Sequence, residues 1–135
     1  MLSVLLIDDD PDLLEIISLN IGNDGDFAIQ ACNSPNVALE LAQKIKFDSI
    51  VCDFNMPEID GGSLLHLLRT RGSTAQHILY SGKELDDDMK ESLSSCVDDY
   101  VQRQGNPEEE FRSIKAIIRT GRIVRIPSPI QKNII

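Results

Sequence analysis

The sequence predicts an α/β fold: a doubly wound, five-stranded parallel sheet with helices on both faces. Short apolar segments of strand length alternate with segments in which apolar residues recur at helical spacing. Because crossovers between parallel strands are right-handed, this alternation favours one sheet that is covered on both sides. The 135 residues suit a single domain, and 41% hydrophobic with 26% charged residues is close to the average for globular proteins.

The first two strand-helix pairs lie within residues 2–45. Residues 2–7 are an almost continuous apolar run, which indicates a strand buried on both faces, and residues 27–32 can form a short second strand. Pro11 and Ser34-Pro35 suit helix starts, and Gly22 with Asn23 suits the end of the first helix. The apolar residues at helical spacing are Leu13, Leu14, Ile16, Ile17 and Ile21 in the first helix, and Val37, Ala38, Leu41, Ala42 and Ile45 in the second.

The third strand is predicted over residues 49–54, so that it brings Asp53 to its end, directly before the loop of residues 55–62. Residues 77–80 predict the fourth strand, and Ser81 with Gly82 forms its exit. The helix between these strands carries the apolar residues Leu64, Leu65, Leu67 and Leu68.

The last two helices begin with acidic residues, which suit helix N-termini. Met89 and Leu93 mark a weak fourth helix, and residues 99–102 predict the fifth strand. Pro107 begins a fifth helix that is predicted to end near Gly121. The acidic residues before the fourth helix are Glu84, Asp86, Asp87 and Asp88, and the apolar residues of the fifth helix are Phe111, Ile114, Ile117 and Ile118.

Polar side chains follow the predicted strands. They are Asp8 and Asp9 after the first strand, Asp53 at the third, Ser81 after the fourth and Arg103 after the fifth. The carboxyl ends of parallel strands form the ligand-binding edge of such folds, so these side chains are expected to meet there. Three carboxylates in one pocket repel one another unless a cation neutralises them, and Mg²⁺ prefers carboxylate and phosphate oxygens. A carboxylate can also form an aspartyl phosphate, and Asp53 is the central candidate.

These residues resemble the receiver domains of two-component response regulators, over about residues 2–120. The acidic pair of that family is similar to Asp8-Asp9, its phosphoacceptor and downstream Met-Pro to Asp53 and Met56-Pro57, its hydroxyl residue to Ser81, and its switch aromatic to Tyr100. The resemblance implies the flavodoxin-like receiver fold, with strand order 2-1-3-4-5.

The resemblance also implies a metal site and a phosphoacceptor. Asp53 would accept the phosphoryl group with Mg²⁺ as the cofactor. Asp9, Asp53 and the backbone carbonyl of Asn55 would bind the ion directly, and Asp8 would bind it through water. The domain would assist only its own phosphorylation and dephosphorylation, so it is not expected to be an enzyme.

Switching is implied at Ser81, which would hydrogen-bond the phosphoryl group, and at Tyr100, which would rotate inward as Ser81 moves. Asn55 and Lys83 occupy positions that tune dephosphorylation in the family.

The chain departs from the family at Arg103-Gln104, where Lys followed by Pro is usual. Arginine is larger and planar, so its contact with the phosphoryl group can differ from that of lysine. Without proline, we expect a trans peptide bond between these two residues and a rearranged loop.

Charge and composition exclude several other classes of protein. The net charge of −9 argues against nucleic-acid binding, although residues 111–135 hold basic residues and no acidic one. The apolar run of residues 1–7 is too short to span a membrane and lacks the features of a signal peptide, so we expect a cytoplasmic protein. Cys32, Cys52 and Cys96 are expected to be buried free thiols. Residues 1–120 are expected to form the receiver and residues 121–135 a C-terminal extension, without an output domain.

The leading functional hypothesis is a single-domain response regulator of a phosphorelay. Its partners would be a sensor histidine kinase or a histidine phosphotransfer protein, and a downstream protein target. Docking, and a possible homodimer, would use the face of the fourth helix, fifth strand and fifth helix. One alternative is a pseudo-receiver, an interaction module without phosphorylation, which Arg103-Gln104 favours. Another is a phosphatase of the haloacid-dehalogenase type, because Asp8 and Asp10 have D-x-D spacing, but Asp12 departs from the continuation of that motif.

Overall fold

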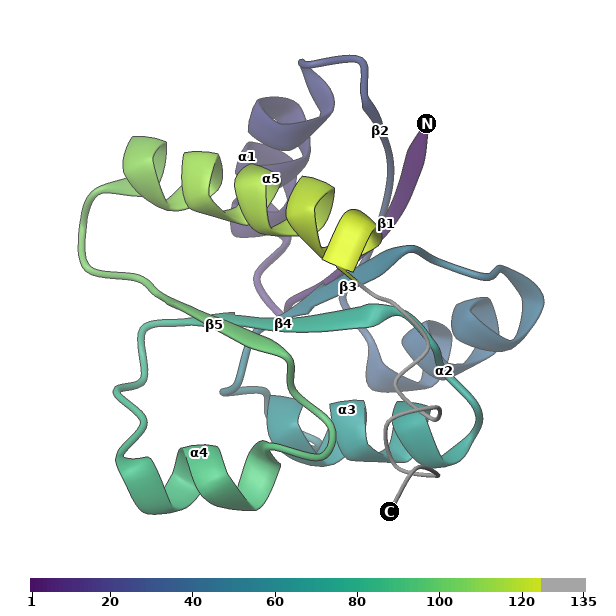
Figure 1. The fold of residues 1–135 in the computed structure, drawn as a ribbon, viewed down its shortest axis with the longest axis vertical. Coiled ribbons are helices and arrows are strands. Elements are labelled where there is room, and N and C mark those ends of the chain that lie inside the picture. The colour runs from purple at the N-terminus through teal and green to yellow at the C-terminus, as the bar shows by residue number, and fades with distance from the viewer. Residues whose placement is uncertain (125–135) are drawn as a thin grey trace.

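A computed structural model of the protein describes residues 1–124, with side chains to residue 121, and strands and helices alternate along the whole of that range (Figure 1). The elements are β1 (Leu2–Ile7), α1 (Pro11–Gly22), β2 (Phe27–Cys32), α2 (Pro35–Lys44), β3 (Ser49–Cys52), α3 (Gly61–Thr70), β4 (Gln76–Ser81), α4 (Asp87–Leu93), β5 (Asp99–Gln102) and α5 (Pro107–Val124). All strand pairs are parallel, and the order is β2-β1-β3-β4-β5. The predicted fold class and strand order are confirmed.

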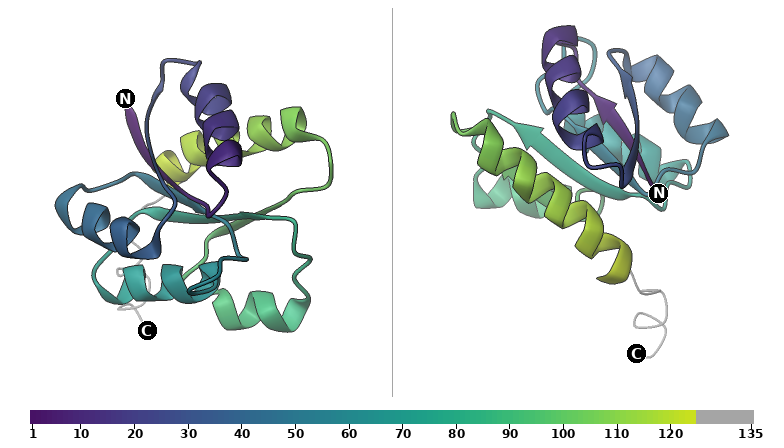
Figure 2. Two further views of the ribbon diagram at one scale, coloured as in Figure 1. Left: turned by 180° about the vertical axis from the view of Figure 1, so that it is seen from behind. Right: turned by 90° about the horizontal axis from the view of Figure 1, so that it is seen from above.

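The sheet separates two hydrophobic cores (Figures 1 and 2). Helices α1 and α5 cover one face, and α2, α3 and α4 cover the other. Strand β1 contributes to both cores, because successive side chains of a strand point to opposite faces. Val4 and Leu6 pack on the α1 and α5 side, whereas Leu5 and Ile7 pack on the α2 and α3 side. This explains the continuous apolar run at the start of the sequence.

Side chains just before the helices act as N-caps. The Asp10 carboxylate accepts hydrogen bonds from the backbone N–H groups of Asp12 and Leu13, and Asp60 accepts from Ser63. Ser34 and Asp86 cap α2 and α4 in the same way. A cap satisfies N–H groups that have no partner within the helix. Asp10 and Asp60 therefore serve the helices, although they belong to the same loops as Asp8 and Asp53.

Helix α5 continues to Val124, so the predicted end near Gly121 is wrong. Gly121 does not have the positive φ of a glycine that ends a helix. A side chain at this position would collide with the Gln76 side chain, which is buried and donates a hydrogen bond to Asp99 at 2.8 Å. Gly121 thus permits close packing of α5 against the start of β4. The predicted extended segment at Ile126-Pro127-Ser128-Pro129 lies outside the described residues.

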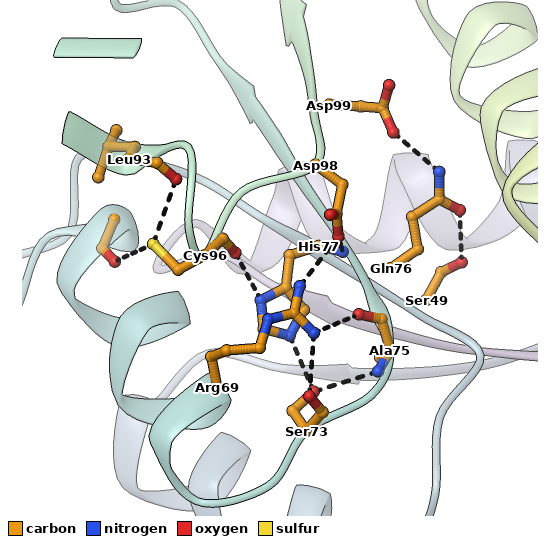
Figure 3. Close-up of polar contacts among 11 residues, drawn as sticks. Ser49, Arg69, Ser73, Ala75, Gln76, His77, Leu93, Cys96, Asp98 and Asp99 are labelled. Atoms are coloured by element: carbon orange, nitrogen blue, oxygen red, sulfur yellow. Dashed lines mark hydrogen bonds and ion pairs between the residues drawn. The ribbon is translucent and has the colours of Figure 1, made fainter. Parts of the chain in front are cut away.

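A polar network ties the start of β4 to α3 and to the connection between α4 and β5 (Figure 3). Fully buried His77 contacts Ser73 Oγ through Nε2 and the Cys96 carbonyl through Nδ1, both at 2.8 Å. Arg69 donates to the carbonyls of Ser73 and Ala75 and pairs with Asp98 at 2.9 Å. Buried polar groups need such partners, so His77 has a structural role at the start of β4. Cys32, Cys52 and Cys96 are buried free thiols, which confirms that prediction.

Candidate functional site

Strand pairing brings the predicted site residues to one edge of the sheet. Ile7 is paired with Cys52, so Asp8 and Asp53 leave neighbouring strands side by side, and the Asp53 N–H donates to the Ile7 carbonyl at 3.0 Å. Ser81 ends β4, and its carbonyl accepts a hydrogen bond from the Arg103 N–H at 2.8 Å. The parallel topology therefore brings together residues that lie up to 95 positions apart in the chain.

Three carboxylates form a cluster at this edge. One oxygen from each of Asp8, Asp9 and Asp53 lies within 4.8 Å of the others, and Asp8 and Asp53 are buried. Burial raises the pKa of Asp8 from 3.8 to about 6, the hydrogen bond from the Asp10 N–H opposes this rise, and the charge of Asp53 adds to it. Burial is therefore the main reason that Asp8 binds a proton more readily than an exposed aspartate does.

Arg103 is the nearest cation to the cluster's central carboxylate. Its Nη2 donates to Asp53 Oδ1 at 3.1 Å, and its guanidinium lies over the Tyr80 ring at 5.2 Å from the centroid. Its Nε is buried and has no hydrogen-bond partner within the described part of the chain. No peptide bond in residues 1–124 is cis, so the expected trans bond between Arg103 and Gln104 is confirmed. Arg103 therefore reaches into the site rather than toward solvent alone.

A buried pair behind Arg103 was missed by the sequence analysis. The Tyr80 hydroxyl donates to Glu110 at 2.6 Å, and both residues are buried. Burial favours the neutral acid, but hydrogen bonds from Tyr80 and from the N–H groups of Gln104 and Asn106 outweigh it and lower the pKa of Glu110. The available signal was the position of Glu110 four residues before Ile114, on the buried face of α5.

Gly61 was also missed, although it fixes the backbone that carries Asp53. Its N–H donates to the Phe54 carbonyl at 2.7 Å. A side chain at Gly61 would collide with the carbonyl group of Asp53. The start of α3 is therefore packed directly against the end of β3, and the glycine in the loop of residues 55–62 was the available signal.

The remaining predicted residues lie around this centre. Ser81 is buried, and its Oγ accepts from the Lys83 N–H at 3.3 Å. Tyr100 directs its hydroxyl to the Lys90 carbonyl at 3.3 Å, and both Ser81 and Tyr100 line a cavity of about 120 Å³. The Lys83 ammonium lies 5.5 Å from the centroid of the Phe54 ring, and Asn55 is exposed beside Asp53.

Comparison with known proteins gives a family. The profile of the response regulator receiver domain matches residues 4–115. Among curated relatives, the probable transcriptional regulatory protein TcrX of Mycobacterium tuberculosis is 27% identical over 96% of this chain and 55% of its own length. The transcriptional regulatory protein PrrA of Mycobacterium leprae is 30% identical over 86% of this chain and 49% of its own length. The chain thus spans about half the length of these two regulators.

Solved structures agree in fold. The receiver domain of the Francisella response regulator 1452 superposes with a TM-score of 0.76 at 27% identity, over 89% of this chain and 98% of that one. The chemotaxis response regulator CheY4 of Vibrio cholerae gives 0.73 at 21% identity, over 87% and 98%. Within the described residues, no helix is both long and apolar enough to cross a membrane. The family match, the sheet topology and the acidic edge agree: this chain belongs to the response regulator receiver domain family of two-component signalling.

Proposed function

We propose that Asp53 accepts a phosphoryl group in a Mg²⁺-dependent reaction. The observation that carries this proposal is the cluster of three carboxylates, Asp8, Asp9 and Asp53, at the carboxyl edge of the sheet. Receiver domains are signalling domains that are phosphorylated and that typically bind Mg²⁺ at an acidic pocket. The chain would accordingly act as a switch and would assist only its own phosphorylation and dephosphorylation.

The carboxylate cluster fits a magnesium ion. Mg²⁺ takes carboxylate oxygens together with waters and phosphate oxygens, and it would relieve the repulsion that helps to raise the pKa of Asp8. Asp9, Asp53 and the Asn55 carbonyl would hold the ion directly, with Asp8 acting through water. When bound, the ion would neutralise negative charge on the transferring phosphoryl group.

The protein groups supply the rest of the transfer chemistry. A carboxylate oxygen of Asp53 forms the new bond to phosphorus while the bond to the donor breaks, and the leaving group keeps that electron pair. Ser81 and Arg103 would contact the phosphoryl oxygens. The buried Nε–H of Arg103, which has no acceptor among residues 1–124, is a donor that such an oxygen could use.

The proposal also includes the donor of the phosphoryl group and the target of the signal. We propose that residues 1–120 act as the receiver of a cytoplasmic response regulator. It would take its phosphoryl group from a histidine kinase or a histidine phosphotransfer protein. It would signal to a protein target, and possible self-association would use the face formed by α4, β5 and α5.

A pseudo-receiver is the second candidate. The Arg103–Asp53 ion pair favours it, because the pair occupies an oxygen of the proposed phosphoacceptor. The phosphatase alternative lacks such support, since Asp10 of the D-x-D pair is the exposed N-cap of α1. Phosphorylation itself separates the two remaining functions.

Intact mass measured after incubation with a small phosphoramidate tests the proposal. With Mg²⁺, the wild type is expected to gain one phosphoryl group, and Asp53→Asn is expected to gain none. Asp87→Asn, an exposed residue in the first turn of α4, is the matched control and should behave as the wild type. No gain in the wild type, or an equal gain without Mg²⁺, would favour the pseudo-receiver or a different acceptor.

Switching at Tyr100 is a separate prediction. Phosphorylated protein is expected to show changed NMR signals for Tyr100 and for α4, because Tyr100 and Ser81 line the same cavity and the Tyr100 hydroxyl contacts the Lys90 carbonyl of α4. Amide spectra recorded before and after stoichiometric phosphorylation measure this. Unchanged signals on α4 and β5, with changes confined to the loops around Asp53, would contradict it.

A further inference from the structure

Arg103 is held between two groups that play different parts. Asp53 binds its Nη2 at 3.1 Å, and the face of the Tyr80 ring lies 5.2 Å from the centre of its guanidinium. An arginine side chain has about 2 kcal/mol of rotamer entropy, so an exposed one seldom keeps a single position. Here the aromatic face restricts the plane of the guanidinium, which an ion pair alone would leave free to turn.

The Tyr80 ring is itself fixed. It is 2% exposed and packs edge-on against Phe111, with ring centroids 6.1 Å apart and planes at 67°. Its hydroxyl donates to one carboxylate oxygen of Glu110 at 2.6 Å. Both ends of this side chain are therefore restrained, by packing at the ring and by a short charge-assisted hydrogen bond at the hydroxyl.

The second oxygen of Glu110 holds the backbone next to Arg103. It accepts from the N–H of Gln104 at 2.8 Å and from the N–H of Asn106 at 3.1 Å. A proline at position 104 has no N–H and could not make the first of these bonds. The glutamine that departs from the family pattern therefore provides the donor that ties the loop after β5 to α5.

Glu110 does this without taking the guanidinium away from Asp53. The Glu110 carboxylate accepts hydrogen bonds from Tyr80 and from two backbone N–H groups, whereas the Arg103 side chain donates to Asp53. One buried carboxylate thus restrains both the aromatic surface beneath the guanidinium and the backbone next to the Arg103 Cα.

We propose that Glu110 and Tyr80 are positioning residues for phosphoryl transfer, which hold Arg103 against Asp53 in place of the missing proline. This inference rests on the proposed function of Asp53. Displacements of about 1 Å at a reacting centre can cost up to about 10²-fold in rate, so a loosened Arg103 should slow phosphorylation measurably.

Rates of phosphorylation by a phosphoramidate with Mg²⁺ test the role. Glu110→Gln is expected to be phosphorylated about tenfold more slowly than the wild type, and Tyr80→Phe, which keeps the ring, about threefold more slowly. Glu108→Gln, whose side chain is 89% exposed on the same helix, is the matched control and should keep the wild-type rate. A double-mutant cycle repeats Glu110→Gln in the Arg103→Lys background. There, Glu110→Gln should change the phosphorylation rate less than twofold, because no guanidinium remains to be positioned.

A second readout does not depend on phosphorylation. The ¹⁵N relaxation of the buried Arg103 Nε–H, without phosphodonor or Mg²⁺, is expected to show an ordered side chain in the wild type and increased motion in Glu110→Gln and Tyr80→Phe. Equal order in all three proteins, or an equal slowing by Glu110→Gln in the Arg103 and Arg103→Lys backgrounds, would overturn the inference. If the wild type accepts no phosphoryl group, the proposed function fails, and the relaxation data alone decide whether the pair positions Arg103.

Discussion

Gly61→Ala is expected to lower the free energy of unfolding by about 3 kcal/mol, at the upper end of the usual cost of overpacking. The added methyl group would overlap the carbonyl oxygen and carbon of Asp53 and the Cα of Phe54. These are backbone atoms at the end of β3, so they cannot move aside as the tip of a flexible side chain can. Relief requires a shift of the strand end that carries the phosphoacceptor, and phosphorylation of Asp53 should slow as well. Urea unfolding measures the stability.

Gly82→Ala is the control for this prediction. Nothing lies within 4 Å of a side chain added at Gly82, and its φ is not positive. The change should therefore alter the free energy of unfolding by less than about 1 kcal/mol, with a small gain expected from the stiffer unfolded chain. A Gly61→Ala protein as stable as Gly82→Ala would show that the α3 start can retreat from β3 without cost.

The fold was predictable because its signals are local and repeated. Each strand-helix pair carries its own apolar period, and prolines at 11, 35 and 107 mark three helix starts that the structure confirms. The weakest prediction of an element concerned the end of α5. There, Gly121 has the composition of a helix end, but it is needed for packing against Gln76, and no local pattern distinguishes these two uses of glycine.

The site was predictable only in part, for a physical reason. Site residues that follow strands can be recognised in the sequence, because the parallel topology alone brings Asp8, Asp53 and Arg103 to one edge of the sheet. Tyr80 and Glu110 do not follow a strand. Tyr80 lies within an apolar strand, and Glu110 lies within a run of glutamates at a helix start, where only its spacing from Ile114 indicates burial. Their role depends on the hydrogen bond between Tyr80 of β4 and Glu110 of α5, which lie 30 positions apart in the chain, and only the packed structure shows this contact.

Asp8→Asn is expected to raise the free energy of unfolding at pH 7.5, without divalent cations, by about 3 kcal/mol. The pKa of Asp8 is raised from 3.8 to about 6 by burial, and the charge of Asp53 contributes. An acid whose pKa is higher in the folded state disfavours folding when it is ionised. The asparagine keeps an oxygen that can accept the hydrogen bond from the Asp10 N–H, and it removes the buried charge.

The sign of the pH dependence follows from the same values. Between pH 6 and pH 4 the folded protein binds more protons at Asp8 than the unfolded chain does, so the wild type gains stability as the pH falls through this window. The advantage of Asp8→Asn should therefore shrink from about 3 kcal/mol at pH 7.5 toward zero near pH 4. Asp12→Asn, an exposed position in the first turn of α1, should show no comparable gain at either pH.

Magnesium is expected to narrow this stability difference, as a fall in pH does. A cation that binds only the folded state stabilises it by mass action. Saturating Mg²⁺ should therefore raise the free energy of unfolding of the wild type more than that of Asp8→Asn, and so reduce the difference between them at pH 7.5. Chemical unfolding at pH 7.5 with chelator, at pH 7.5 with Mg²⁺, and at pH 4 gives the three values. A variant less stable than the wild type in chelator would mean that Arg103 already neutralises the pocket, and that the acidic edge does not need a metal ion to relieve its charge.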